Sequence, residues 1–294
     1  MQPPTLRQLR TFLAVVETGS VSAAAQSLNL TQPAASQQLR ELERALGVRL
    51  LHRAAGRMLP TPAGEAVIEP ARRIQGALDD TIAAVQAFRS GAVGRVRLGT
   101  GATACINLLP PVLAAVKQRM PGLEIAVATG NSNEIAHRVA VGELDIGLVT
   151  LPLQPNRALT ATRLLNDPLL AVIPRAHAPD GDSISAARLA ALPLILYEPG
   201  GSTRAIIDAW FRRAGPPPQP AMELDSIETI KVLVGGGLGA SILPQLALGS
   251  PVRDAVVKPL RPALGRQLGI VLRREKVLDR GLRLVLDALR ETAG

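Results

Sequence analysis

The first part of the chain carries apolar side chains at the spacing of short amphipathic helices. Between residues 5 and 17 they recur every three or four positions, which predicts a helix, and Gly19 supplies a plausible end. We expect Ser22 to open a second helix and Asn29 to close it, since Asn tolerates the left-handed backbone conformation. The residues expected to face the core are Leu6, Leu9, Phe12, Leu13, Val16, Ala24, Ala25 and Leu28.

A third helix is predicted from Thr31 to about Leu46, with Gly47 as its C-cap, and it carries a proline near its start. With Thr31 as N-cap, Pro33 lies in the first turn, where backbone N–H groups have no intrahelical partner. The proline therefore fixes where the helix begins. Two helices joined by a short turn form a helix-turn-helix, and the first residues of its second helix enter the DNA major groove. The positions expected inward are Ala35, Leu39, Leu42 and Leu46.

Polar side chains that can hydrogen-bond to bases occupy the outer face of this third helix. Gln can pair with adenine, Arg with guanine and Ser with several bases. Gly56 can turn a hairpin among the basic residues that follow, which predicts a wing for phosphate or minor-groove contact. An ordinary solvated helix face would show the same residue types, so both interpretations stay open at this point. The wing residues are Arg49, His52, Arg53 and Arg57, and the candidate DNA-binding residues are Ser22, Thr31, Gln32, Pro33, Ser36, Gln37, Arg40 and Arg53.

Thr61 and Pro62 form an N-cap and first-turn pair that opens a long helix, expected to reach about Ser90. Apolar residues along it are spaced alternately by four and three, the pattern of a coiled coil, although packing against a core gives the same spacing. We expect this helix to form a dimer that presents two recognition helices to two half-sites. Pro70 should kink or delay its first turns. The seam residues are Val67, Ala71, Ile74, Leu78, Thr81, Val85 and Phe88.

After Gly91 the pattern changes to alternating strands and helices. Two β-α-β-α-β runs, joined by a bridging strand at 169–174, predict two α/β lobes that each contain a mainly parallel sheet. We expect a last strand at 268–272 and a helix at 278–289 to return to the first lobe. The expected strands are 96–99, 123–128, 144–149, 194–197, 221–224 and 239–243, and the expected helices are 105–118, 134–141, 202–213 and 227–234.

Two strand-to-helix turns occupy matching positions in the two lobes. Ligands of such sheets bind outside the carboxyl ends of the strands, here in the cleft between the lobes. Both turns offer hydroxyl groups and free backbone N–H groups, which suit a carboxylate or a similar anion, although helix capping alone would use the same residues. The turns contain Thr100, Gly101 and Thr103 in the first lobe and Gly200, Gly201, Ser202 and Thr203 in the second.

Composition narrows the classes of function. The net charge of +9 favours a polyanionic partner, although a merely basic protein fits equally well, and 2% aromatic residues argue against a base-stacking platform. Cys105 is the single cysteine, so neither an internal disulfide nor a CxxC metal site can form. The N-terminal residues lack the apolar core of a signal peptide, and no apolar run reaches about 18 residues. We therefore expect a cytoplasmic, soluble protein without a membrane partner.

The N-terminal residues resemble those of LysR-type transcriptional regulators. The resemblance is carried by LRQLRTFLAVVETGSVSAAAQSLNLTQPAASQQLRELERALGVRLLHR, which begins at Leu6, and by TPAG at 61–64. Weaker likenesses are ELDIGLV at 143–149 and GGGLGASILP at 235–244. The resemblance implies an all-α winged helix-turn-helix domain at 1–61 and a linker helix for dimerisation at 62–92. It also implies a two-lobed α/β effector domain like a periplasmic binding protein at 93–294, with lobe I at 93–165 and 267–294 and lobe II at 166–266.

This family likeness also implies roles for single residues. Gln32, Pro33 and Ser36 occupy the DNA-reading positions of the family, and Arg53 lies in its wing. The residues implied to line the effector cleft are Thr100, Thr103, Thr150, Ser202 and Thr203, with Gly101 in the same turn.

Two other classes of protein compete with a regulator. An enzyme is disfavoured because the Gly235-x-Gly237-x-x-Ala240 run follows a helical pattern instead of a strand, and because neither a zinc-binding histidine spacing nor a GxSxG motif occurs. A solute-binding protein explains two lobes but leaves the first 62 residues without a role. We therefore expect a homodimer or homotetramer that binds double-stranded promoter DNA and responds to a small, anionic effector. We expect no catalytic residue, metal or cofactor.

Overall fold

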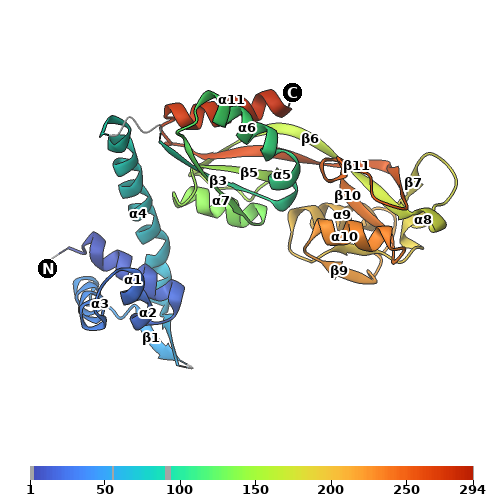
Figure 1. Ribbon diagram of the computed structural model, residues 1–294. Helices are drawn as coiled ribbons and strands as arrows, with labels where there is room; N and C mark the ends of the chain where they lie inside the picture. Colours follow the sequence, from blue (N-terminus) through green and yellow to red (C-terminus); the bar gives the residue numbers. More distant parts are fainter. Residues whose placement is uncertain (1–2, 55, 90–93, 294) are drawn as a thin grey trace. The chain divides into compact units, whose positions relative to one another are not determined.

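The computed structural model describes residues 3–54, 56–89 and 94–293, with the side chains of residues 80 and 83–89 outside that description. The chain divides into two compact units, residues 1–91 with 140–143 and residues 92–139 with 144–294 (Figure 1). The predicted boundary between linker and effector domain, at residues 92 and 93, lies outside the described residues, and the predicted domain limits stay predictions.

The first unit begins with helices α1 (Leu6–Thr18), α2 (Val21–Ser27) and α3 (Gln32–Leu46). Thr5 and Gln8 form a capping box at the start of α1, and Gly19 ends it with φ of 67°. The N-cap of α2 is Ser20, not Ser22, so the predicted opening residue is wrong. Ser22 instead lies exposed inside the helix.

Helix α3 begins as predicted. Thr31 is its N-cap, with the Ala34 N–H donating to its side chain at 3.4 Å, and Pro33 lies in the first turn. Gly47 ends the helix in the left-handed conformation. Phe12, Val15, Ala35 and Leu42 are fully buried, whereas Leu6 and Leu46 are exposed and were wrongly expected inside. Both lie at helix ends, where the apolar stripe has left the core.

A hairpin and a long helix complete this unit. Strands β1 (Leu51–Ala54) and β2 (Arg57–Pro60) pair antiparallel around Gly56, whose φ is 77°, which confirms the predicted wing. Helix α4 (Pro62–Arg89) continues through Pro70. In its seam, Ala71 is buried and Ile74 is exposed, while the side chains of Val85 and Phe88 lie outside the described residues.

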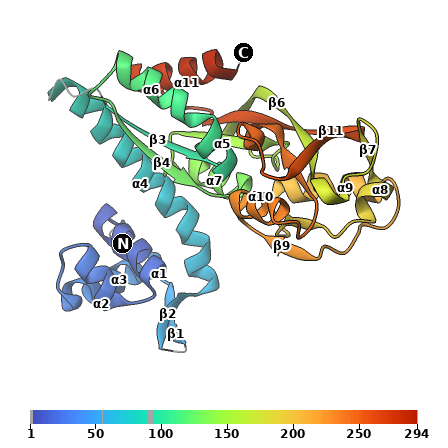
Figure 2. The same cartoon turned by 45° about the vertical axis from the view of Figure 1, so that its right-hand side comes forward.

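The second unit is built on a sheet in the order β10-β6-β11-β5-β3-β4, with β7 beside β11. Figure 2 shows β3 beside β4 in this sheet. In the first lobe, β3 (Arg95–Thr100) pairs in parallel with both β4 (Glu124–Thr129) and β5 (Ile146–Leu151). The helix predicted at 105–118 is wrong in its extent, because two helices replace it and prolines open the second. The first-lobe helices are α5 (Ala102–Asn107), α6 (Leu109–Arg119), α7 (Ser132–Ala140) and α11 (Arg280–Ala293).

Two long antiparallel strands run through both lobes, β6 (Leu159–Pro174) and β11 (Ala255–Arg273). The predicted strands at 169–174 and 268–272 are only parts of these, because the polar residues elsewhere in them hide the strand pattern. Helix α11 returns to the first lobe as expected, where Leu282 and Val285 share a core with Leu98.

The second lobe has its own core around Trp210, Phe211 and Ile242. Strands β8 and β9 are parallel, as predicted, whereas β10 is antiparallel to β6. The remaining elements are β7 (Ile184–Ser185), α8 (Ala186–Ala190), β8 (Ile195–Tyr197), α9 (Ser202–Arg212), β9 (Met222–Leu224), α10 (Ile227–Gly235) and β10 (Ser241–Pro244), with short 3-10 turns at Arg175–His177 and Gln245–Leu248.

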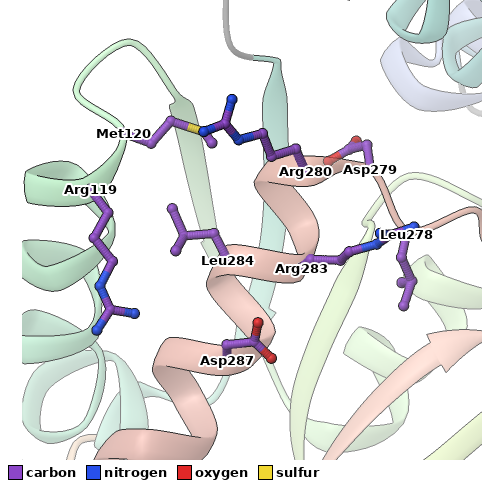
Figure 3. A pocket seen from close by; sticks show the side chains of 8 residues that line it. All are labelled: Arg119, Met120, Leu278, Asp279, Arg280, Arg283, Leu284 and Asp287. Atoms are coloured by element: carbon purple, nitrogen blue, oxygen red, sulfur yellow. The ribbon is translucent and has the colours of Figure 1, made fainter.

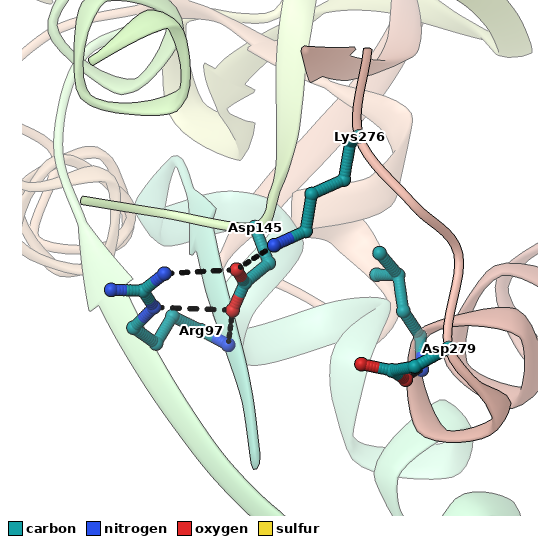
Figure 4. A network of polar contacts seen from close by, with 5 residues as sticks. Arg97, Asp145, Lys276 and Asp279 are labelled. Carbon is teal, nitrogen blue, oxygen red and sulfur yellow. Dashed lines mark hydrogen bonds and ion pairs between the residues drawn. The ribbon is translucent and has the colours of Figure 1, made fainter. Parts of the chain in front are cut away.

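A buried carboxylate ties three segments of the first lobe together (Figure 4). Asp145 accepts hydrogen bonds from the Arg97 backbone and guanidinium, at 2.8 to 3.2 Å, and from Lys276 Nζ at 2.9 Å. Burial alone would raise the pKa of Asp145, but the bonds and charges of Arg97 and Lys276 outweigh it and lower that pKa. Asp145 therefore fixes β3, the start of β5 and the segment before α11. None of the described helices is long and apolar enough to span a membrane.

Candidate DNA-binding and effector-binding sites

The outer face of α3 displays the predicted polar residues to solvent. Thr31, Gln32 and Pro33 are exposed in its first turn, and Ser36 is half-buried one turn later. The inner face holds the helix in place, because Leu42 is fully buried and Gln38 Oε1 accepts a hydrogen bond from the Thr11 hydroxyl at 2.5 Å. The start of α3 is therefore rigidly mounted and open to a partner.

Further along α3, the exposed side chains are linked to one another. Arg40 Nη2 donates to Gln37 Oε1 at 2.8 Å, and Gln37 Nε2 donates to Glu41 Oε1 at 2.8 Å. Glu41 Oε2 accepts a further bond from Gln8 Nε2 of α1 at 3.2 Å. This chain holds Gln37 and Arg40 along the helix face and still leaves guanidinium N–H groups of Arg40 available for a base or a phosphate.

The wing is anchored to α3 at its base. Glu43 Oε1 accepts the N–H groups of Leu50 and Leu51 at 2.7 and 3.2 Å, just where β1 begins. Arg53 and His52 are exposed on the hairpin. Arg57 lies in the wing as expected, at the start of β2, and its side chain reaches the turn at Gly19, where an added Cβ would lie 2.7 Å from Arg57 Nε.

The TPAG run at 61–64 joins wing and linker helix. Thr61 Oγ1 donates to the Arg49 carbonyl at 2.8 Å and accepts the Gly64 N–H at 3.1 Å. A Cβ at Gly64 would overlap the carbonyl oxygen of Leu50, so only glycine fits this close approach. The motif therefore holds the start of α4 against the base of the wing.

The predicted residues of the first lobe gather at one edge of the sheet. Thr100 ends β3 in register with Thr129 at the end of β4, and Thr150 lies near the end of β5. Thr100, Thr103 and Thr150 are buried. The Thr150 N–H donates to Ser132 Oγ at 3.0 Å, whereas the Thr100 hydroxyl has no hydrogen-bond partner among the described residues.

Helix α9 brings the second turn to the same edge. Gly201 precedes it in an extended conformation, and Ser202 and Thr203 are half-buried in its first turn. Thr203 Oγ1 accepts a hydrogen bond from Arg266 Nη1 at 3.0 Å. Because the residue after Arg266 pairs with Leu151 at the end of β5, this bond joins the start of α9 to the first lobe's strand ends.

A buried ion pair, which the sequence pattern did not single out, lies at this junction. Arg266 Nε and Nη2 both lie 2.9 Å from Asp167 Oδ2, and Asp167 Oδ1 accepts the Leu246 N–H at 3.0 Å. The pair connects β6, β11 and the turn after β10. Charged residues inside otherwise apolar strand segments, in LLNDPLLAV and LGRQLGIVL, are the signal that could have identified it.

A separate pocket of about 500 Å³ lies between the end of α6 and α11 (Figure 3). Arg119, which lines this pocket, pairs with Glu291 at 2.8 Å. The hydrogen bond and charge of Glu291 raise the pKa of Arg119. The lining residues are Arg119, Met120, Leu278, Asp279, Arg280, Arg283, Leu284 and Asp287. Among the described residues, no group of three or more His, Cys, Asp or Glu could hold a metal ion.

Comparisons with known proteins agree with this division of the chain. Residues 6–65 match the model of the bacterial regulatory helix-turn-helix proteins of the lysR family, and residues 89–294 match the LysR substrate binding domain. The chain is 33% identical to the HTH-type transcriptional regulator CbbR of Xanthobacter flavus, covering 98% of this chain and 88% of that protein. It is also 33% identical to the HTH-type transcriptional activator CmpR of a Synechocystis strain, covering 84% and 81%.

Solved structures show the same architecture over the full length. Full-length OxyR from Pseudomonas aeruginosa aligns with a TM-score of 0.77 at 23% identity, covering 100% of this chain and 97% of that one. Full-length CbnR in complex with its target DNA aligns with a TM-score of 0.70 at 25% identity, covering 98% and 100%. The chain therefore belongs to the LysR family of DNA-binding transcriptional regulators, with an N-terminal helix-turn-helix domain and a C-terminal effector-binding domain.

Proposed function

We propose that this regulator binds a specific promoter sequence and changes its DNA contacts when a small, anionic molecule enters the cleft between its lobes. The observation that carries the DNA half is the exposed first turn of α3, whose opposite face is locked into a core by Phe12 and Leu42. Reading double-stranded DNA requires such a rigid helix with free polar side chains. A role at a promoter also favours the cytoplasm as its location.

The roles of the DNA-binding residues follow from their placement. Gln32, Ser36, Gln37 and Arg40 are proposed to contact base edges, because they lie on the open face of α3. Thr31, Pro33 and Ser22 are proposed to position the helix and meet the backbone, and Arg53 to meet phosphate from the wing. Exposed Ile74 and Ile82 on α4 fit a helix that pairs with a second copy, in a dimer or a tetramer.

The effector half of the proposal rests on the edge of the sheet where Thr100, Thr129 and Thr150 lie at or near the strand ends. Its proposed residues are Thr100, Gly101, Thr103, Thr150, Ser202 and Thr203. The fully buried Thr100 hydroxyl has no partner among the residues that the structure describes, and such a hydroxyl is costly unless another group bonds to it. Hydroxyls and backbone N–H groups at the carboxyl ends of strands suit a small anion.

A fluorescence-anisotropy titration on the intergenic DNA upstream of the gene tests the DNA half. We expect the full chain to prefer this DNA over random duplex in competition, and sedimentation analysis to show a dimer or tetramer. Equal competition by random DNA would contradict sequence-specific binding. A thermal-shift screen with small carboxylates tests the effector half. That half fails if no anion changes the melting temperature of the wild-type chain and if Thr100→Val and Thr203→Val leave DNA binding unaltered.

A further inference from the structure

Tyr197 occupies the position of the second lobe where ligands of parallel sheets bind. It is the last residue of β8, and α9 begins shortly after it at Ser202. Its backbone carbonyl accepts a hydrogen bond from the buried Arg204 guanidinium, which is held in turn by Asp208 and Glu223 at 2.8 Å each. The end of β8 is therefore fixed in place at the carboxyl edge of the sheet.

The Tyr197 hydroxyl is buried and has no hydrogen-bond partner among the described residues. Its ring is only half-buried, so the oxygen points inward while part of the ring faces solvent. Burial raises the pKa of this phenol, which also lies within range of the charges of Arg266 and Asp167. The phenol is thus a neutral O–H donor at physiological pH, and buried donors of this kind normally have an acceptor.

Arg266 supplies further donors at the same place. Its side chain is 7% exposed, and Asp167 and Thr203 accept from its Nε, Nη1 and Nη2 atoms. A guanidinium carries five N–H groups, so Arg266 keeps N–H groups beyond these bonds. Asp167, in contrast, already accepts bonds at both of its oxygens, from Arg266 and from the Leu246 N–H.

Thr203 completes the set. Its Oγ1 accepts from Arg266 Nη1 at 3.0 Å, which leaves the hydroxyl hydrogen free to donate elsewhere. Tyr197, Thr203 and Arg266 are therefore donor-rich, while the Asp167 carboxylate beside Arg266 is already occupied. A group that only accepts hydrogen bonds, such as a carboxylate, complements these donors.

We propose that Tyr197, Thr203 and Arg266 form an oxyanion subsite that binds the carboxylate of the effector, with Asp167 as the positioning residue that orients Arg266. The inference rests on the proposed function, because it assumes that an effector occupies the cleft between the lobes. It adds two contacting residues and assigns to them the acidic group of a small carboxylic acid.

The test uses the single tyrosine of the chain as a reporter. The full-length protein, labelled with ¹³C in the tyrosine ring, is titrated with benzoate, succinate and pyruvate, each beside its neutral amide. We expect at least one acid to shift the Tyr197 signals and to raise the melting temperature, while its amide does neither. Tyr197→Phe and Arg266→Lys should weaken that binding about tenfold or more, as expected for hydrogen bonds to a charged group.

The Tyr197→Phe variant separates ligand binding from a structural role. Because the hydroxyl has no partner among the described residues, its removal should leave the ligand-free melting temperature unchanged or higher. A lowered melting temperature would show that the hydroxyl is structural and would overturn the assignment. Unchanged acid affinity in Tyr197→Phe would overturn the subsite but not the cleft, provided that Thr100→Val, which lies outside the subsite, still weakens binding. If no acid shifts the wild-type signals, the carboxylate assignment is wrong.

Discussion

On α3, the side chains proposed to meet DNA are exposed or half-buried, and Arg40 donates a hydrogen bond to Gln37 along the helix. Between the lobes, Thr100, Asp167 and Arg266 are buried, and Arg266 bonds to side chains of β6 and α9. Arg40 and Gln37 can reorient without disturbing the core, whereas Arg266 and Asp167 connect β6 with β11 and with the turn after β10. The first surface suits a polymer whose phosphates attract long cationic side chains, and the second suits one small molecule enclosed by fixed groups.

The largest expected effect comes from breaking the buried pair. Asp167→Asn or Arg266→Met leaves one partner buried without its counter-charge, which should lower the unfolding free energy of the effector unit by about 3–5 kcal/mol. Urea unfolding followed by Trp210, the single tryptophan, measures this loss. Replacing both residues together, with Asp167→Leu and Arg266→Met, should restore most of it.

The matched control is an exposed pair of the same chemistry. Arg119 and Glu291 are 2.8 Å apart but largely in solvent, so Arg119→Met should leave unfolding unchanged within error. Equal losses at the two pairs would contradict the distinction between buried and exposed polar groups.

Asp145 gives a second, pH-dependent effect. Because its folded pKa lies below that of an unfolded carboxyl, its contribution to stability is present above about pH 4 and is lost as the pH falls through the folded pKa. Asp145→Asn should destabilise the effector unit by about 3 kcal/mol at neutral pH, since Arg97 and Lys276 lose their shared carboxylate. Urea unfolding followed by circular dichroism at pH values from about 3 to about 7, a range that covers carboxyl titration, measures this loss of unfolding free energy. An equally steep acid dependence in the variant would show that another carboxyl is responsible.

Gln32→Ala should alter DNA selectivity without altering folding. Gln32 is exposed at the first turn of α3, so truncation costs little stability, but loss of a paired base edge should cost about 1–3 kcal/mol on the preferred sequence. Competition between promoter DNA and single-base variants measures it. An equal loss of affinity for every DNA sequence would mean that Gln32 contacts only the DNA backbone.

Arg53→Ala should have the smallest effect of the series. Its loss should weaken binding to all duplexes alike and reduce the slope of log affinity against log salt by about 1. Anisotropy at several salt concentrations measures the slope. Glu17→Ala, an exposed change on α1, provides a surface control with no expected effect on the slope. A change in selectivity instead of slope would assign Arg53 to base reading.

The sequence predicted the N-terminal unit closely because its signals are local. Thr31, Pro33 and Gly47 define the limits of α3 through backbone rules that act within one helical turn. The wrong choice of Ser22 as N-cap is an error within one helical turn, since Ser20 is an equally good cap two residues earlier. End effects likewise explain why Leu6 and Leu46 were wrongly expected in the core.

The effector unit was less predictable because its key features are non-local. The polar halves of β6 and β11 form strands only because they pair with each other across about a hundred residues. Asp167 and Arg266 are acceptable in buried strands only as partners, which no single-segment pattern reveals. Thr100 and Thr103 could be singled out because strand-to-helix turns follow a local pattern, whereas Thr150 was implied only by the family resemblance.

The most direct test of the central claim is a competition anisotropy experiment with full-length wild-type and Gln32→Ala protein on the upstream intergenic DNA. We predict that the wild type prefers this DNA over random duplex, and that Gln32→Ala loses much of the preference while its melting temperature and its affinity for random DNA stay the same. A wild-type protein that binds both DNAs equally, or a Gln32→Ala variant with full preference, would contradict the proposal that α3 reads the promoter.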